Sequence, residues 1–354
     1  MKIALLADAS HTNIQRWCEG LQNNGVDLHL LSFTPQNSMV QQTYPLPLPG
    51  LPGKVNYFTA VLYVKRLLRE IQPDILMSYY VTGYGTLGTL TGFHPLVMIT
   101  AGSDVLIAPR SPLMRRILRS TLKRGDLVAA FAPHMAQAVR QLGVPDEKIF
   151  TLPQGIFAEP FIAHRSPQPK TGDPLKIIST RSLRPIYNLD LLIRATSYLA
   201  QSGVPFEITI ASKGGLENEL KSLAQSLDVA QYITFAGFVP NHELPELLAL
   251  HNTYLSLTPS DGVSASLLEA MAVGLVPLVV DHPANRYWIT PGENGILLDM
   301  LTPEAAARAL LNVSTNLALR QRAWTHNVKI VTERGDMQRN IARYVKRISE
   351  LIAR

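Results

Sequence analysis

Short apolar segments alternate with longer amphipathic stretches along most of the chain. Apolar runs with polar or turn-forming neighbours are typical of strands buried in a parallel sheet, and the stretches between them have the spacing of crossover helices. In the first half this pattern predicts strands at residues 2–7, 27–33, 74–80, 95–100, 126–132 and 148–153. We therefore expect an α/β fold with helices on both faces of the sheet.

The pattern stops in a polar, proline-rich stretch at 163–174 and then restarts. In the second half it predicts strands at 175–180, 206–211, 232–238, 253–258, 275–280 and 295–298. The prediction is two Rossmann-like doubly wound domains facing across a cleft, at 1–162 and 175–330, with 163–174 as the linker. Residues 331–354 are predicted as a helix with one apolar face that crosses back to the first domain.

Composition narrows the class of protein. The 354 residues are 46% hydrophobic and 17% charged, which excludes a disordered chain. The apolar runs are shorter than a membrane span needs, and the start MKIALLAD is interpreted as a first strand and not as a secretory signal. A single cysteine, Cys18, allows no internal disulfide, which is typical of a reducing compartment. We therefore expect a cytoplasmic protein.

Gly83, Gly85 and Gly88 form a GxGxxG sequence after a predicted strand, and Asp104 follows further along. This spacing favours a dinucleotide site, so an NAD-dependent oxidoreductase is one alternative function. However, the strand is the third of its domain and not the first, and the helix that follows it is short. The other interpretation is that these small residues let a helix pack closely on the sheet.

The most informative segment is residues 260–274, which follow the predicted strand 253–258. Ligands bind at the carboxyl ends of the strands in such sheets. Ser264 and Ser266 are good N-cap residues, and the free amides of a helix beginning there would face an anion such as a diphosphate. The structural alternative is a capping box, Ser266-Leu-Leu-Glu269, in which Glu269 satisfies the terminus of its own helix.

With Asp261, seven intervening residues and Glu269 in the context SLLEAMAVG, the chain resembles the family 4 glycosyltransferases of the GT-B fold. Further matching segments are SHTNIQRW (10–17), TAGSDVL (100–106), STRSLRPIYNLDLLI (179–193), ITFAGFVP (233–240) and DHPANRYWITPGENG (281–295). The resemblance implies an enzyme that transfers a hexosyl or N-acetylhexosaminyl group from a nucleotide-sugar to a glycan or lipid-linked acceptor, generally with retention of anomeric configuration.

The resemblance also assigns roles to individual residues. It implies that Glu269 accepts hydrogen bonds from the ribose hydroxyls and that Arg181 clamps the diphosphate. The residues expected around the donor are Asp261, Gly262, Val263, Ser264 and Ser266 at the sugar and diphosphate, and Phe238 and Val239 at the base. The nucleotide-sugar is a substrate, and no cofactor is expected.

The chain departs from the family pattern at two positions. Tyr187 stands where the family usually has a lysine; Arg184 either supplies that positive charge for the leaving diphosphate or is a solvated surface arginine. Ala101 stands where many members have a histidine. The front-side mechanism proposed for retaining transferases needs no enzymatic base, because the leaving phosphate takes the acceptor's proton. No Asp-x-Asp sequence occurs, so we expect no metal.

Two residues of the first domain are candidates for the acceptor side. His11 lies on the first predicted strand-to-helix loop, where it contacts acceptor or phosphate or else simply caps or packs. Asp104 is a candidate partner for an acceptor hydroxyl, and a turn-stabilising aspartate is the alternative.

Positive charge is concentrated in residues 110–124, which contain no acid. The basic residues there are Arg110, Arg115, Arg116, Arg119, Lys123 and Arg124, as many as the net charge of +6. With its apolar positions at helical spacing, the segment predicts an amphipathic helix. The interpretations are a solvated basic face or, through Arg115, Arg116, Arg119 and Lys123, peripheral binding to the anionic inner face of the membrane. Nucleic acid is not expected, because no aromatic residues are interleaved.

We therefore expect a retaining, metal-independent glycosyltransferase. Besides the oxidoreductase, a nucleotide-sugar epimerase on the same architecture remains an alternative, which requires acid–base residues around the sugar. A non-enzymatic sugar-binding protein with two lobes is the third alternative.

Overall fold

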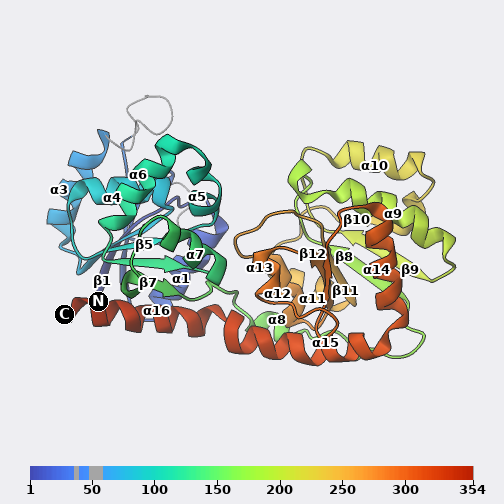
Figure 1. The fold of residues 1–354 in the computed structure, drawn as a ribbon. Helices are drawn as coiled ribbons and strands as arrows, with labels where there is room; N and C mark the ends of the chain where they lie inside the picture. The colour runs from blue at the N-terminus through green and yellow to red at the C-terminus, as the bar shows by residue number, and fades with distance from the viewer. Residues whose placement is uncertain (36–39, 48–58, 354) are drawn as a thin grey trace. The chain divides into compact units, whose positions relative to one another are not determined.

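The computed structural model describes residues 1–35, 40–47 and 59–353. They form two compact units (Figure 1): residues 1–154 with 337–354, and residues 155–336. Each unit is built on one parallel β-sheet with helices packed on it, as the alternating pattern of apolar runs predicts.

The sheet of the first unit has the strand order β3-β2-β1-β4-β5-β6-β7. Its strands are β1 Lys2–Leu6, β2 Asp27–Ser32, β3 Thr43–Pro45, β4 Ile75–Tyr79, β5 Leu96–Ile99, β6 Leu127–Ala130 and β7 Ile149–Thr151. Its helices are α1 Thr12–Asn23, α3 Val61–Ile71, α4 Thr86–Thr91, α5 Ser103–Leu106, α6 Pro112–Lys123, α7 Pro133–Gln141 and α16 Met337–Ile352, with short helical turns at Val81–Gly85, Ala108–Arg110 and Asp146–Lys148. The order reverses between β1 and β4, where ligands bind in folds of this type.

The sheet of the second unit has the order β10-β9-β8-β11-β12-β13. Its strands are β8 Leu175–Ser179, β9 Phe206–Ile210, β10 Ile233–Phe235, β11 Thr253–Ser256, β12 Val276–Val280 and β13 Ile296–Leu298. Its helices are α8 Glu159–Ala163, α9 Leu189–Gln201, α10 Glu217–Ser226, α11 Leu244–Ala249, α12 Ala265–Ala272, α13 Pro283–Arg286, α14 Pro303–Thr315 and α15 Leu317–Ile330, with turns at Pro185–Tyr187, Ala230–Tyr232 and Val331–Gly335. The reversal lies between β8 and β11.

Alternating side chains of the second sheet enter two separate apolar cores. Ile177 belongs to the core formed with α9, α10 and α14, and its neighbour Ile178 belongs to the core formed with α8, α11 and α12. This follows from the period of two along a strand. Because both faces are covered at the centre of the sheet, β11 and β12 are buried along their whole length, and runs of this kind are what the sequence revealed.

The proline-rich segment 163–174 does not connect the two units, contrary to the prediction. The chain passes between them at Gln154–Gly155 and at Asp336–Met337. Ser166 accepts a hydrogen bond from Nε1 of Trp324 on α15 (2.8 Å), and the Arg165 guanidinium stacks 3.2 Å from that indole ring. These long-range contacts hold the segment on the second unit, although its composition is typical of a linker.

The helix α16 belongs to the first unit. In Figure 1 it is the red helix labelled α16, and it packs against α1. The Tyr344 hydroxyl donates to the carbonyl of Leu152 (2.8 Å), and its ring meets that of Trp17 edge-on with 5.0 Å between centroids. A Cβ added to Gly20 would lie 2.1 Å from Cδ1 of Ile341, so any larger residue there would displace the end of the Ile341 side chain.

The three glycines of the GxGxxG sequence lie in and after the turn at Val81–Gly85. A Cβ added to Gly88 would lie 3.2 Å from Cδ1 of Leu96 and 3.5 Å from Cδ1 of Leu6. The glycine therefore allows α4 to pack closely on the sheet, as the structural interpretation of this motif predicts.

Candidate active site

Three loops of the second unit leave the sheet side by side at the carboxyl ends of their strands. β11 pairs with β8 on one side and with β12 on the other, all in parallel. The segments that follow these strands begin at Thr180, Leu257 and Asp281. They carry the predicted residues Arg181 and Asp261, at the topological switch point where such sheets bind ligands.

Arg181 connects these loops through its guanidinium. Its Nη2 donates to Oδ2 of Asp261 (2.9 Å), and its Nη1 donates to Oγ of Ser264 (2.9 Å) and of Ser266 (3.1 Å). Ser266 is held in turn by the hydroxyl of Tyr254 (2.8 Å). The structure therefore brings together four of the residues that the sequence assigned to the donor side.

The charge of Arg181 is stabilised although the side chain is largely buried. Burial opposes the charged form, but Tyr254, Asp261 and Tyr187 outweigh it and raise the pKa of the guanidinium. The Tyr187 ring lies 4.3 Å from the guanidinium carbon. Tyr187 thus supports the arginine with a cation–π contact at the position where the family pattern usually has a lysine.

The helix α12 begins at Ala265, with Ser264 as its N-cap. Oγ of Ser264 accepts from the amide of Leu267 (3.3 Å). Glu269 is therefore in the second turn of the helix, two residues beyond the position that a capping-box glutamate occupies. The capping-box interpretation of Ser266 and Glu269 is wrong, and Glu269 is a buried carboxyl group, 5% exposed, close to the start of the helix.

Phe238 and Val239 follow β10, and the Phe238 side chain is 65% exposed. A large exposed ring at the carboxyl edge of the sheet is available to a planar ligand. Gly237 precedes it with φ +71°, and a Cβ there would lie 3.8 Å from Cε of Lys213. Lys213, which sequence reasoning missed, follows β9 and thus lies next to this loop.

Arg184 and Lys213 are the candidate cations besides Arg181. Arg184 is exposed, and its amide bonds the carbonyl of Ser182 (2.8 Å). Lys213 is also exposed, and its carbonyl accepts from the amide of Leu183 (3.1 Å). The two loops are therefore joined through backbone, and both basic side chains leave the same edge of the sheet.

His282 is a second residue that sequence reasoning missed. It follows β12, is 8% exposed, and interacts electrostatically with Asp261 and Arg181. Nδ2 of Asn285 donates both to the carbonyl of Val280 (2.8 Å) and to Nε2 of His282 (3.0 Å). Nε2 is therefore an acceptor, and Nδ1 carries the proton of the neutral ring. Burial lowers the pKa of His282.

In the first unit a pocket of about 660 Å³ lies at the carboxyl ends of β1, β4 and β5. His11 lines it, with a side chain that is 74% exposed. Tyr80 lines it too, with φ 80° and ψ 100°. A residue other than glycine adopts such a backbone at a cost of about 1–3 kcal/mol, and such strain clusters at functional sites.

Asp104 does not face an acceptor, contrary to the first of its two interpretations. It is fully buried, and its carboxylate accepts from the amides of Val81 (2.9 Å), Ala101 (3.0 Å) and Gly102 (3.0 Å). Burial raises the pKa of Asp104, against these hydrogen bonds. The residue stabilises the turns after β4 and β5, which is the alternative that the sequence left open.

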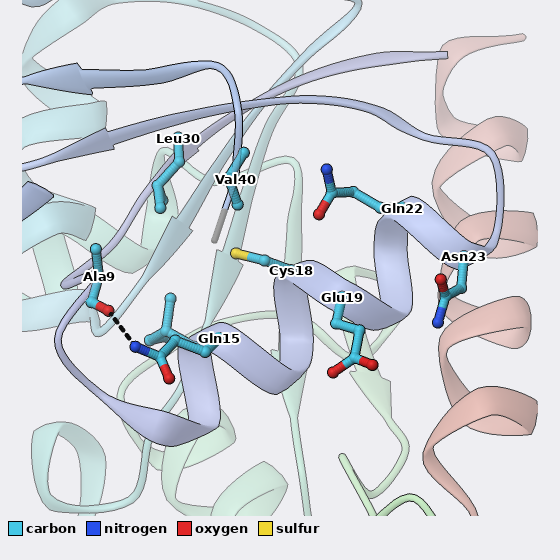
Figure 2. A pocket seen from close by; sticks show the side chains of 9 residues that line it. Ala9, Gln15, Cys18, Glu19, Gln22, Asn23, Leu30 and Val40 are labelled. Atoms are coloured by element: carbon cyan, nitrogen blue, oxygen red, sulfur yellow. Dashed lines mark hydrogen bonds between the residues drawn. The ribbon is translucent and has the colours of Figure 1, made fainter. Parts of the chain in front are cut away.

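A smaller pocket of about 250 Å³ lies beside α1 (Figure 2). Cys18 lines it together with Gln15, whose Nε2 donates to the carbonyl of Ala9 (3.2 Å). Burial raises the pKa of the Cys18 thiol to about 12, so it stays protonated at neutral pH. A protonated buried thiol is neither a nucleophile nor a good metal ligand.

The helix α6 contains four of the six basic residues of the segment 110–124, since Arg110 and Arg124 lie just outside its ends. Leu118 and Leu122 are fully buried, whereas the side chains predicted for a membrane surface are exposed: Arg115, Arg116, Arg119 and Lys123. Leu113, at the start of the helix, is 69% exposed. Within the described residues, no helix combines the length and apolar character that crossing a bilayer requires.

Two parallel doubly wound sheets in one chain, with an arginine clamp and a helix N-terminus at the switch point of the second, are typical of the GT-B class of glycosyltransferases. Family models agree: "Glycosyl transferase 4-like" matches residues 2–131, and "Glycosyl transferases group 1" matches residues 161–329. The chain belongs to these family 4-like glycosyltransferases, as its motifs predict.

Relatives that match in sequence are also named as glycosyltransferases. WcaL of Salmonella typhimurium, named as a colanic acid biosynthesis glycosyltransferase, is 30% identical over 63% of this chain and 55% of its own length. AmsK of Erwinia amylovora, an amylovoran biosynthesis glycosyltransferase, is 27% identical over 75% of this chain and 70% of its own length. The chain thus spans about half the length of WcaL.

Solved structures share the fold over the whole chain. HepE of Anabaena, in complex with UDP and glucose, has a TM-score of 0.79 at 15% identity, with 99% of this chain and 100% of HepE covered. The sucrose-phosphate synthase of Thermosynechococcus elongatus has a TM-score of 0.81 at 14% identity, with coverage of 100% and 99%. Both confirm the predicted pair of Rossmann-like sheets.

Proposed function

We propose that the chain transfers a sugar from a nucleotide-sugar to a glycan or lipid-linked acceptor, with retention and without a metal ion. The observation that carries this proposal is the clamp of Arg181, Asp261, Ser264 and Ser266 at the start of α12. A guanidinium beside a helix N-terminus matches a diphosphate in charge and in hydrogen bonding.

In this mechanism the bond between the anomeric carbon and the diphosphate oxygen breaks, and the acceptor oxygen bonds to the same face of the sugar. The acceptor proton passes to the departing phosphate oxygen. Arg181 and the first amides of α12 stabilise the negative charge that develops on the diphosphate. Asp261 accepts hydrogen bonds from the donor sugar, and Glu269 accepts them from the ribose.

A thermal-shift panel tests the donor class. UDP is the first nucleotide to test, because HepE has been crystallised with UDP-glucose. GDP, ADP and NAD are compared with it, and every ligand is measured once in EDTA and once in magnesium. We expect a nucleoside diphosphate to raise the melting temperature equally in EDTA and in magnesium. Stabilisation by NAD alone, or only in magnesium, would overturn the proposal.

A product assay separates transfer from epimerisation. Each nucleotide-sugar is incubated with and without a saccharide mixture, and the products are followed by proton NMR. We expect a new glycosidic bond with the anomeric configuration of the donor. Conversion of the donor to its epimer without acceptor favours the epimerase, and inverted linkages exclude a retaining mechanism.

We further propose that the exposed face of α6 binds an anionic membrane surface. Arg115, Arg116, Arg119 and Lys123 carry four positive charges next to the exposed Leu113. Each basic residue contributes about 1 kcal/mol near an anionic surface. A lipid-linked acceptor, one of the two acceptor classes proposed above, would require such contact.

Vesicle sedimentation tests this face. We expect the protein to pellet with vesicles of phosphatidylcholine and phosphatidylglycerol but not with phosphatidylcholine alone. Replacing Arg115, Arg116 and Arg119 by glutamine should abolish pelleting, whereas the same change at the exposed Arg343 and Lys346 of α16 should not. Equal recovery with both vesicles contradicts the proposal.

A further inference from the structure

The pocket at the carboxyl edge of the first sheet has walls from three loops. Asp8 follows β1, Tyr80 follows β4, and Ala101 and Ser103 follow β5. With a volume of about 660 Å³ it has room for a sugar ring. The pocket lies at the switch point of the sheet, and ligands bind at this point in folds of this type.

Two of these loops are fixed by one buried carboxylate. Asp104 accepts from Val81 on the loop after β4 and from Ala101 and Gly102 on the loop after β5. A bound ligand therefore meets walls that are already formed, and it does not have to order them.

Tyr80 presents an aromatic surface in the pocket. Its backbone has φ 80°, its side chain is 38% exposed, and its hydroxyl is 2.8 Å from Oγ of Ser103. The ring thus has a fixed orientation and an open surface. Aromatic rings with a fixed polar end bind ligands that combine an apolar face with hydroxyl groups, as a pyranose ring does.

Asp8 supplies a fixed negative charge. Its Oδ1 accepts from the amide (3.0 Å) and hydroxyl (2.7 Å) of Ser10 and from the hydroxyl of Thr34. Burial opposes ionisation, but these hydrogen bonds outweigh it and lower the pKa of Asp8. Its Oδ2 lies 3.7 Å from Nε2 of His11, beyond hydrogen-bond distance. This oxygen can accept from ligand hydroxyls.

Among the described residues that line the pocket, the only basic side chain is the exposed His11. No arginine or lysine in this lining compensates the charge of Asp8. A phosphate or a uronic acid would meet the carboxylate of Asp8 without a guanidinium or ammonium to pair with. Repulsion from Asp8 therefore weakens the binding of an anionic ligand. The hydroxyl groups of a neutral ligand instead donate charge-assisted hydrogen bonds to this carboxylate.

From this arrangement we infer that the pocket binds an uncharged sugar unit, stacked on Tyr80 and hydrogen-bonded to Asp8, and that it rejects anionic sugars and phosphates. The inference deepens the proposed function, because it gives the chemical class of the acceptor's terminal residue. Any phosphate of a lipid-linked acceptor then binds outside this pocket.

Saturation-transfer NMR on the full chain tests the inference without turnover. The probes are methyl glucoside, methyl galactoside and methyl N-acetylglucosaminide, compared with methyl glucuronide and glucose 1-phosphate. We expect at least one neutral glycoside to bind, with at least tenfold weaker binding of both anions. Equal or tighter binding of an anionic probe, or no binding of any neutral glycoside, overturns the inference.

Substitutions at Asp8 and Tyr80 test whether these residues bind the neutral glycoside. Asp8→Asn should weaken the neutral glycoside severalfold and reduce the discrimination against methyl glucuronide. Tyr80→Leu should abolish binding, while Tyr80→Phe, which keeps the ring, should retain most of it. Asp27→Asn, at the amino end of β2, is the matched control and should change neither. Discrimination that survives Asp8→Asn in a folded variant contradicts the assignment.

The outcomes also separate this inference from the proposed function. Binding of UDP, followed by thermal shift, depends on the second unit and should be unchanged in Asp8→Asn. If no nucleotide binds but neutral glycosides still do, the donor proposal fails and the pocket assignment stands. If UDP binds and the anionic probes compete with the neutral ones, the pocket assignment alone fails.

Discussion

The two units present the same edge of the same kind of sheet with opposite charge. In the second unit, Arg181 is a buried cation held by Asp261 and two serine hydroxyls. In the first unit, Asp8 is an ionised carboxylate, and no arginine or lysine lines its pocket among the described residues. The difference teaches that a Rossmann-like sheet only positions the loops, whereas the first residues after each strand decide which charge a ligand must have.

Removing Arg181, the cation of the second unit, should have the largest effect, because it abolishes the charge difference between the two units. We expect Arg181→Ala to lower kcat by about 10²–10³-fold, because a preorganised charge at the leaving group is lost. Arg181→Lys should recover only part, since a lysine cannot donate to Asp261 and both serines in the same planar geometry. Steady-state kinetics with saturating donor measure the effect. The surface pair Lys176–Glu207 provides the control, and Lys176→Ala should leave kcat unchanged.

Glu269 tests whether the anion at the start of α12 serves the ligand or the helix. We expect Glu269→Ala to weaken nucleotide binding by about 1.5–3 kcal/mol, the usual contribution of hydrogen bonds to a charged group, in calorimetric titrations with UDP or the preferred nucleotide. The melting temperature should change little in comparison with the affinity. A variant that unfolds but binds normally in its folded fraction would show a structural role instead.

The second positive charge of the donor edge comes either from Arg184 or from Lys213. We expect Lys213→Ala to lower kcat by about tenfold and Arg184→Ala by less, because Lys213 lies beside the loop of Gly237 and Phe238. Comparing the two variants in the same kinetic assay ranks them. The reverse order would assign the missing lysine's charge to Arg184, and no change in either would show that Arg181 suffices.

The smallest expected effect is a loss of stability in acid that is confined to the second unit. Burial lowers the pKa of His251 and of His282. Both bind fewer protons when folded, so their neutral forms stabilise the fold above a pH of about 6.5. That contribution is lost as the pH falls below this value.

Thermal melts between pH 7.5 and 5 measure this loss, and His251→Gln should reduce the pH dependence. Nδ1 of His251 donates to the carbonyl of Leu247 (2.8 Å), and Nε2 lies 2.9 Å from Oγ1 of Thr209. The Leu247 contact favours the charged ring, but burial outweighs it. The exposed His242 is the matched control. A slope that is the same in His251→Gln and in wild type excludes His251 as the cause.

The sequence predicted the sheets because their central strands are buried on both sides and form continuous, mostly apolar runs. The runs at 253–258 and 275–280 became the central strands β11 and β12. It missed β3, whose three residues, Thr43–Pro45, are too short and too polar to form such a run. It also misplaced the linker, because the contact of Arg165 with Trp324 joins residues far apart in the sequence.

The donor residues were predictable where a motif is continuous and less so where the site depends on strand order. Asp261, Ser264 and Ser266 lie within one loop and helix, and they are brought to Arg181 as expected. Lys213 and His282 join them only because β9 and β12 flank the central pair of strands. The capping-box pattern at Ser266 failed because the helix begins two residues earlier than the pattern requires.

The return of α16 to the first unit has a consequence for the order in which the chain matures. A ribosome releases the sheet of that unit first, but Tyr344 and Ile341, which cover Trp17 and Gly20, emerge only after residues 155–336. The apolar surface of α1 must therefore stay uncovered while the whole second unit is synthesised. Nascent chains stalled shortly after Asp336 should be bound by chaperones at this surface, and completion of the last helix should release them.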